Sequence, residues 1–417
     1  GERKDFGALV LATPKGKGWK YRGHVGTGFT EKDLSAILKQ MKPLETTTSP
    51  FKEKVPVNGE VTWLKPKLIA DISYGETTSD NIFRHPVFLR LRDEKSLENI
   101  NEEVVEELTE VQNNNVEMRV GEYKVSVTNR QKIFWPDEGF IKGDVIDYYD
   151  KNYRTILPYL KDRPLSLKRN PNGIRDEGFY HKDAGEKVPK FVKVFKVKSE
   201  SNNKIIDYIV CNNKATLIYL ANLGCIEMNP WNSTIKHIDK PTWMVIDIDP
   251  SPKNTFIQVV DAALATKQIL DKAGVKSYCK TSGATGLHIY VPLKNKYDYN
   301  TVKEFAHIVV QLVTEELPDF TTLERSLSKR GDNIYMDYLQ NRTGQTLASA
   351  YSLRPVPGAS VSMPLEWKEV NHKLNPLDFT LQNAAKRIAK KGDIFKPVLT
   401  QSNNLEKALQ KLSEENN

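Results

Sequence analysis

Long apolar runs and closely spaced cysteines are both missing from this sequence of 417 residues. No stretch of about eighteen apolar residues occurs, and Gly1 to Asp5 lack the basic and apolar pattern of a signal peptide, so we expect neither a membrane span nor export. Only three cysteines are present, Cys211, Cys225 and Cys279, too few and too far apart for a disulfide framework or a zinc site. Unpaired thiols are typical of a reducing compartment, which favours a cytoplasmic protein.

Lysine and arginine are absent from residues 96–118, where seven glutamates occur. Because the whole chain has a net charge of +8, the residues outside this segment carry +15. Such a surplus favours a polyanionic partner such as nucleic acid, although many basic proteins bind none. The acidic segment predicts a solvated linker at residues 96–122 in a chain long enough for about two or three domains. An acidic helix docked on a basic neighbour is the alternative.

The N-terminal part of the chain reads as short strands joined by turns. Phe6–Ala12 and Trp19–Val25 are predicted to pair, and the apolar residues of Glu31–Met41 lie on one face of a helix. Val61–Leu64 and Leu68–Ile72 supply further strands. A small all-β barrel with one inserted helix is typical of OB-folds that bind nucleic acids.

A short apolar strand with two acids carries the strongest signal for chemistry. Met244 to Asp249 contains alternating β-branched and acidic residues, and Pro250 prevents its continuation in a sheet. Asp247 and Asp249 share one face of this strand, with Cα atoms about 6.5 Å apart. Their repulsion is best offset by a hard divalent cation, which prefers carboxylate oxygens. A solvated strand end or a helix cap is the alternative at this point.

Three later features suit the binding of phosphates and metal ions. Ser282–Gly286 is a glycine-rich turn that brings backbone N–H groups close to a phosphate, and it leads into a strand that carries His288. His288 is either a phosphate donor or a buried core residue. Asp337, on another apolar strand, is the third carboxylate that a two-metal site requires, and Arg330 and Arg354 can neutralise a triphosphate.

Helices alternate with strands through the larger C-terminal part of the chain. They are predicted near residues 145–160, 215–223 and 256–273, which indicates an α/β domain with a mixed sheet. Within this C-terminal part, the aromatic residues Phe179 and Tyr180 are followed directly by the basic residues His181 and Lys182. Aromatic and basic residues are often interleaved in this way on the base-stacking surfaces of nucleic-acid-binding proteins.

The sequence around residues 84–95 resembles a known family. Arg-His-Pro-Val-Phe-Leu-Arg-Leu-Arg-Asp-Glu-Lys is similar to the last conserved motif of ATP-dependent DNA ligases, in the form found in the bacterial end-joining ligase D. Residues 23–29 and 49–51 resemble other parts of the same OB domain. The resemblance implies that Arg90, Arg92 and Lys95 contact the triphosphate of ATP when the complete ligase adenylates its lysine. A basic surface strand is the alternative.

The nucleophilic lysine of such ligases is missing from this sequence. It lies in a Lys-x-Asp-Gly motif, and no such tetrapeptide occurs here. We expect the domain that carries it to lie upstream of Gly1, so that this chain alone does not seal nicks.

Four further motifs resemble the polymerase domain of ligase D, a member of the archaeo-eukaryotic primase superfamily. They are, in order, Asp-Ile-Asp-Pro at 247–250, Thr-Ser-Gly-Ala-Thr-Gly-Leu-His-Ile-Tyr at 281–290, Met-Asp-Tyr-Leu-Gln-Asn at 336–341 and Tyr-Ser-Leu-Arg at 351–354. The resemblance implies a multidomain chain, with a small all-β OB barrel before an α/β mixed-sheet primase-polymerase domain. The expected divisions are an OB domain at 1–95, a linker at 96–122, the polymerase domain at 123–396 and a tail at 397–417.

The resemblance also implies roles for individual residues. Two Mn²⁺ or Mg²⁺ ions would bind Asp247, Asp249 and Asp337. The incoming nucleoside triphosphate would contact Lys168, Ser282, His288, Arg330 and Arg354, and Phe179 and Tyr180 would pack near the bases. Lys132 and Lys142 would bind the 5′-phosphate on the far side of a gap. Two positions depart from some relatives, with Asn229 in place of a histidine and Thr285 in place of a lysine.

The implied activity is template-directed nucleotidyl transfer, which fills gaps or extends ends with NTP or dNTP during non-homologous end joining of double-strand breaks. DNA ends and gaps with a 5′-phosphate are the expected partners, together with a Ku-like end-binding protein. Two alternatives from other classes stay open. A two-metal nuclease would use the same three acids, and a non-catalytic module would bind DNA ends with the acids in structural pairs.

Overall fold

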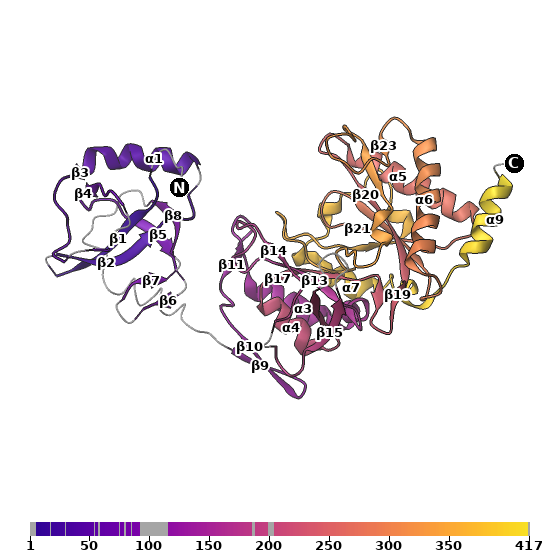
Figure 1. Cartoon of the computed structure of the whole chain (residues 1–417), viewed down its shortest axis with the longest axis horizontal. Helices are drawn as coiled ribbons and strands as arrows, with labels where there is room; N and C mark the ends of the chain where they lie inside the picture. Colours follow the sequence, from indigo (N-terminus) through magenta and orange to yellow (C-terminus); the bar gives the residue numbers. More distant parts are fainter. Residues whose placement is uncertain are drawn as a thin grey trace. The chain divides into compact units, whose positions relative to one another are not determined.

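A computed structural model gives the fold of the chain. The residues that it describes are 6–16, 18–29, 31–53, 55–56, 59–74, 76–78, 81–84, 86–91, 116–185, 188–198 and 204–415. The chain divides into two compact units, Gly1–Gln112 and Asn113–Asn417, and each is described by itself (Figure 1).

Among its described residues, the first unit contains short antiparallel strand pairs and the helix α1. β1 (Leu9–Lys15) pairs with β2 (Gly18–Val25), and α1 (Glu31–Met41) and the 3-10 turn η1 (Lys42–Leu44) follow. The other pairs are β3 (Glu45–Thr46) with β4 (Trp63–Leu64), β5 (Ala70–Ser73) with β8 (Val87–Leu91), and β6 (Glu76–Thr77) with β7 (Phe83–Arg84). Val25, Ile37 and Phe88 are buried together, so the core joins β2, α1 and β8.

The second unit begins with elements that surround one of its two apolar cores. The strand pairs are β9 (Val116–Val120) with β10 (Tyr123–Val127), β11 (Ile133–Trp135) with β12 (Phe140–Ile141), and β15 (Lys193–Lys198) with β16 (Ile205–Val210). A three-stranded sheet has the order β14 (Phe179–His181), β13 (Leu165–Arg169), β17 (Cys225–Pro230). Helices α3 (Lys142–Leu160) and α4 (Lys214–Asn222) pack in the same core. The hairpin of β18 (Ser233–Thr234) and β19 (His237–Pro241) leads onward.

A six-stranded sheet forms the centre of the rest of the second unit. Its strand order is β23 (Thr321–Thr322), β24 (Ile334–Asp337), β20 (Trp243–Asp249), β22 (Leu287–Pro292), β21 (Tyr278–Thr281), β25 (Pro364–Leu365). β23 and β24 are parallel and the other neighbours are antiparallel, so the sheet is mixed. Helices α5 (Phe256–Lys272) and α6 (Tyr299–Glu316) lie beside this sheet (Figure 1).

The alternation of side chains along β20 decides where its acids lie. Met244, Ile246 and Ile248 are buried in the core formed with α5 and α6. Trp243 and Val245 are buried in the other core, with α3 and α4. Because successive residues of a strand point to opposite faces, Asp247 and Asp249 point to the face away from α5 and α6.

The segment predicted as a C-terminal tail belongs to the folded second unit. After the turns η3 (Leu339–Asn341), η4 (Trp367–Glu369) and η5 (Pro376–Asp378), the chain forms α7 (Leu381–Lys391), α8 (Pro397–Thr400) and α9 (Leu405–Glu415). Leu405, Ala408 and Leu412 are buried against the core that contains α5 and α6. Within the described residues up to 415, the region 397–417 that we designated a C-terminal tail thus contains a helix whose apolar face is packed on this core.

The predicted linker also ends earlier than its composition suggested. Residues 92–115, most of the acidic segment, lie outside the described residues. Val116–Val120, which the prediction included in the linker, instead form β9, because Val120 packs in the same core as Val125 and Val127 of β10. Within the described ranges, no helix combines the length and the apolarity needed to span a bilayer.

Candidate active site

Four polar side chains form a row across four neighbouring strands of the six-stranded sheet. Asp247 of β20 lies opposite Asp337 of β24 on one side and opposite His288 of β22 on the other. His288 in turn lies opposite Lys280 of β21. Directly opposed residues of an antiparallel pair point to the same face, so this polar row shares the face of Asp247. The His288 Nε2 atom lies 3.3 Å from Asp247 Oδ1.

Asp337 and Asp249 are held by hydrogen bonds from nearby donors. Asp337 accepts hydrogen bonds from the Leu339 backbone N–H at 2.7 Å and from Gln340 Nε2 at 2.9 Å. Asp249 accepts one from Arg330 Nη1 at 3.1 Å. Among the residues that the structure describes, no three side chains of His, Cys, Asp or Glu already converge as ligands of one ion. A cation bound by all three acids therefore requires these contacts to be shared or exchanged.

Burial raises the pKa values of these acids. It raises the pKa of Asp247 to about 6, against the opposing charges of Lys280 and Arg354. Burial, followed by the charge of Asp247, raises the pKa of Asp337 to about 6 and also raises the pKa of Asp249. Deprotonation is thus costly without a nearby cation. A divalent ion that binds here would displace protons, and its affinity would fall as the pH drops below about 6.

The buried bases beside the acids are shifted in the opposite direction. Burial, and then the charge of Arg354, lowers the pKa of Lys280 to about 7. Burial, and then the charge of Lys280, holds the pKa of His288 well below its ordinary value. His288 is therefore a neutral imidazole at neutral pH.

The glycine-rich turn connects β21 to β22 and closes against β20. Ser282 Oγ accepts hydrogen bonds from the backbone N–H groups of Ala284 at 3.1 Å and Gly286 at 3.0 Å. These two N–H groups are thus occupied, and the Ser282 hydroxyl proton stays available for a ligand. A Cβ atom on Gly286 would lie 2.2 Å from the carbonyl oxygen of Ile248, so no other residue fits there. Gly283 has a φ of +76°, a conformation that favours glycine.

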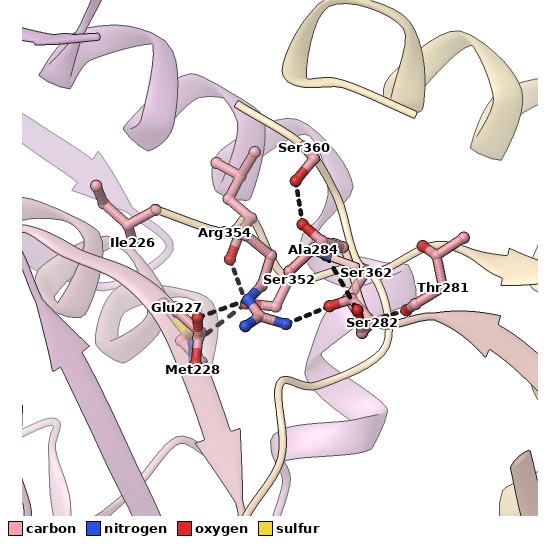
Figure 2. Close-up of polar contacts among 12 residues, drawn as sticks. Ile226, Glu227, Met228, Thr281, Ser282, Ala284, Ser352, Arg354, Ser360 and Ser362 are labelled. Atoms are coloured by element: carbon pink, nitrogen blue, oxygen red, sulfur yellow. Dashed lines mark hydrogen bonds and ion pairs between the residues drawn. The ribbon is translucent and has the colours of Figure 1, made fainter. Parts of the chain in front are cut away.

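Arg354 is fixed between two elements of the site (Figure 2). Its Nε donates to Glu227 Oε2 at 2.6 Å, and its Nη1 donates to the backbone oxygen of Ser282. Glu227 lies on β17 and is only 5% exposed. The ion pair holds the guanidinium beside the turn and offsets part of its charge.

These residues line one cavity of about 180 Å³. Asp247, Asp249, Ser282, His288 and Arg354, predicted from distant parts of the sequence, all contribute to its wall. The two positions that depart from some relatives lie there as well. Asn229 is 2% exposed, and its Nδ2 atom has no hydrogen-bond partner among the described residues, whereas Thr285 is exposed. An unpaired amide donor suits an anionic ligand.

Other predicted nucleotide contacts lie on the neighbouring strand pair of β13 and β14. Lys168 Nζ lies 5.0 Å from the centre of the Tyr180 ring and donates to the Gly178 oxygen at 2.8 Å. Arg169 lies 5.4 Å from the ring of Phe179. Tyr180 lines the cavity, whereas Lys168 and Phe179 are not part of its lining. Both rings are largely exposed, as bases that stack on them would require.

Lys132 and Lys142 form a separate pair of cations at the start of α3. Lys142 Nζ donates to the Thr128 oxygen at 2.7 Å, and Lys132 Nζ donates to Asn172 Oδ1. Burial, and then the charge of Lys132, lowers the pKa of Lys142 to about 8. Burial also lowers the pKa of Lys132. Two desolvated cations side by side favour an anion between them.

The predicted ligase motif is described only in part. Arg90 lies on β8, where its backbone pairs with Asp71. Arg92 and Lys95 lie outside the described residues. Their proposed contacts with ATP stay predictions.

Three residues of the site were not identified from the sequence. Glu227, Lys280 and Gln340 each contact a predicted residue: Arg354, His288 and Asp337, respectively. The sequence of β17 contained a signal, since Glu227 lies between the apolar residues Ile226 and Met228, and a charged residue on a buried strand needs a partner.

Comparison with known proteins agrees with this arrangement. The family model described as the LigD primase-polymerase domain matches residues 141–395, and that of the ATP dependent DNA ligase C terminal region matches residues 2–95. The multifunctional non-homologous end joining protein LigD of Pseudomonas aeruginosa is 26% identical over 398 residues, which cover 93% of this chain and 47% of that protein. The bifunctional LigD of Bacillus subtilis is 34% identical over 273 residues, or 65% of this chain and 44% of that protein. The chain spans about half the length of these curated relatives.

A solved structure is similar to the second unit. The polymerase domain from Mycobacterium tuberculosis ligase D, in complex with DNA, aligns with a TM-score of 0.63 and 25% identity, over 68% of this chain and 100% of that one. These matches confirm the predicted fold class, an OB-type ligase region followed by a mixed-sheet polymerase domain. The chain therefore belongs to the LigD primase-polymerase family.

Proposed function

We propose that this chain transfers nucleotides to the 3′-hydroxyl of a primer at DNA breaks, under the direction of a template and with the release of pyrophosphate. The observation that carries the proposal is the convergence of the Asp247 and Asp249 strand, the glycine-rich turn and Arg354 on one cavity. The likeness to a polymerase domain solved with DNA supports the same substrate class. Ends and gaps with a 5′-phosphate, NTP or dNTP, and repair by non-homologous end joining form the proposed context.

The donor set fits two divalent ions in kind. Asp247, Asp249 and Asp337 supply only carboxylate oxygens, which Mg²⁺ and Mn²⁺ prefer, and they lie on adjacent strands with Asp247 between the other two. When bound, such ions would neutralise the charge that develops on the attacking and leaving oxygens. Arg330 forms an ion pair with Asp249. We expect its side chain to turn toward the triphosphate when Asp249 binds a cation.

The chain's own residues would bind and orient the nucleotide. The Ser282 hydroxyl, the Asn229 amide and the Arg354 guanidinium supply donors toward a triphosphate in the cavity. His288, held beside Asp247, adds an imidazole donor on the same side. Fixed donors of this kind contribute to rate mainly by positioning and by charge stabilisation.

A primer-extension assay tests the activity directly. The full chain is incubated with a labelled primer on a 5′-phosphorylated gap, Mn²⁺ and each NTP or dNTP. We expect the primer to lengthen by template-directed addition. A shortened primer would instead assign the same acids to a nuclease, and an unchanged primer with metal-independent end binding would indicate a non-catalytic module.

The Lys132 and Lys142 pair predicts a preference for 5′-phosphorylated gaps. Lys142→Met removes one buried cation while keeping the length of the side chain. We expect the affinity for a 5′-phosphorylated gap to fall by about 10- to 100-fold, since hydrogen bonds to charged groups contribute about 1.5–3 kcal/mol, and the affinity for the unphosphorylated gap to change little. Fluorescence anisotropy with both gaps measures this difference.

The matched control is Lys151→Met, an exposed lysine on the same helix. It removes an equal charge without touching the pair. If Lys142→Met lowers the affinity for both gapped DNAs equally, the lysine contributes only general charge and the 5′-phosphate assignment is wrong.

The first unit is proposed to act within a complete ATP-dependent ligase. Its match to a ligase C-terminal region supports this assignment. Arg90, Arg92 and Lys95 would then contact ATP, and a Ku-like protein would bring the DNA ends together.

A further inference from the structure

Lys280 is a fully buried lysine that the proposed reaction has not used. Its side chain is 0% exposed, and it ends the polar row that contains Asp337, Asp247 and His288. Lys280 Nζ lies 2.9 Å from His288 Nδ1 and also contacts Ser362 Oγ. A lysine rarely occupies such a position unless its N–H groups have partners.

The direction of each hydrogen bond around Lys280 follows from the available protons. The Ser362 hydroxyl has one proton, and it donates that proton to the backbone oxygen of Thr281 at 2.9 Å (Figure 2). Ser362 Oγ can therefore only accept from Lys280. A charged ammonium group has three hydrogens and no lone pair, so Lys280 in that state can only donate to His288 Nδ1, and a neutral amine would still have a hydrogen left for it.

The other side of the imidazole faces a group that only accepts. Asp247 Oδ1 lies 3.3 Å from His288 Nε2, and a carboxylate there has no proton to give. With Lys280 donating to Nδ1 and Asp247 accepting at Nε2, the neutral ring carries its proton on Nε2. The opposite tautomer would place a proton against the Lys280 donor and a lone pair against the carboxylate.

We propose that Lys280 is a positioning residue that holds the proton of His288 on Nε2, so that an N–H group, and not a lone pair, faces Asp247 and a bound triphosphate. This inference rests on the proposed function for its effect on nucleotide transfer, but the tautomer itself belongs to the free protein. Lys280 lies on the far side of His288 from Asp247 in the row, and acts through the imidazole.

A purely structural role makes a different prediction. A buried lysine that serves only packing can be replaced by methionine of similar length with little loss, because the desolvation of the cation is also removed. Tyr290, whose ring centre lies 5.7 Å from Lys280 Nζ, is buried and offers apolar contact to the replacement. Lys280→Met therefore separates the donor function from packing.

The first test is spectroscopic and needs no nucleotide. The chain is labelled with ¹⁵N-histidine, and the His288 signals are assigned by their loss in His288→Gln. We expect the wild-type ring to be protonated at Nε2, and Lys280→Met to populate the Nδ1-protonated form in part, since the donor to Nδ1 is lost while Asp247 still accepts at Nε2. A wild-type ring protonated at Nδ1, or an unchanged tautomer in Lys280→Met, would overturn the proposal even if the chain proves to be a polymerase.

The second test is a double-mutant cycle on primer extension. We expect Lys280→Met to lower kcat by about 10- to 100-fold, the range seen when a partner that orients a functional histidine is removed. Gln at position 288 carries an amide N–H that does not depend on Lys280 for its proton. Lys280→Met should therefore have less than about a twofold effect in the His288→Gln background. Additive losses in the double variant would show that Lys280 acts independently of His288.

Cys279→Ala is the matched control for disturbance of β21. Cys279 is the neighbour of Lys280, is fully buried and faces the opposite core. We expect this variant to lose stability but to keep the Nε2-protonated tautomer and kcat. Thermal unfolding of each variant separates loss of fold from loss of the tautomer.

Discussion

Replacing Asp247 by asparagine is expected to reduce primer extension by about a thousandfold, because the residue between the other two acids loses the charge that we propose to attract divalent ions. The change keeps the shape of the side chain, and Asp247 lies between Asp337 and His288 in the sheet. Single-nucleotide incorporation under single-turnover conditions measures the loss. DNA binding should be retained, since the charge removed is negative.

The same variant is expected to be more stable than the wild type at pH 7. The pKa of Asp247 is raised by burial from 3.8 to about 6, so the folded state holds the proton more tightly than the unfolded state. Native stability therefore falls as the pH rises from about 4 to about 6, and asparagine removes this loss. Denaturant unfolding should show a gain for Asp247→Asn at pH 7 that disappears near pH 4.

The control for both measurements is Asp271→Asn. Asp271 is a half-exposed carboxylate on α5 that pairs with Lys267, one turn earlier in the helix. We expect little change in extension or in the pH dependence of stability. Primer extension that survives in Asp247→Asn would contradict the assignment of this strand to the reaction.

Replacing Arg354 by methionine is expected to destabilise the second unit by about 3 kcal/mol, as removal of one partner of a buried ion pair usually does. Glu227, 5% exposed, would keep a carboxylate that has lost its 2.6 Å contact with Arg354. The backbone oxygen of Ser282 would lose a donor at the same time. The free energy of unfolding in urea measures the effect.

A second substitution separates stability from function in this pair. The double variant Arg354→Met with Glu227→Met removes both charges, and we expect it to regain most of the lost stability. It should not regain primer extension, because the cation that we propose to face the triphosphate is still missing. A double variant as unstable as Arg354→Met alone would show that packing, and not an unpaired charge, causes the loss.

The sequence predicted the parts of the site that depend on local pattern. Asp247 and Asp249 share a face because residues i and i+2 of a strand do so, and the boundaries of α1 and β20 follow apolar periodicity closely. The glycine-rich turn was also predicted from its two glycines, and the structure explains Gly286, where a side chain would meet the carbonyl of Ile248. These features need no knowledge of distant contacts.

The rest of the site depends on strand register, which the sequence does not reveal. Lys280 contacts His288 because β21 and β22 pair in one particular alignment, and a shift by one residue would turn it to the other face. Glu227 contacts Arg354 across 127 positions in the chain. The acidic residues before Val116 also led us to assign β9 to the linker, since this strand has only five residues in which apolar and polar side chains can alternate.

The main chain of the glycine-rich turn lies directly against the main chain of β20. Because a Cβ atom on Gly286 would lie 2.2 Å from the carbonyl oxygen of Ile248, no side chain can separate the glycine-rich turn from the strand that carries Asp247 and Asp249. Asn229 and Thr285 also line the cavity but take no part in this contact, so substitutions there can change the charge of the cavity without altering the spacing of turn and strand.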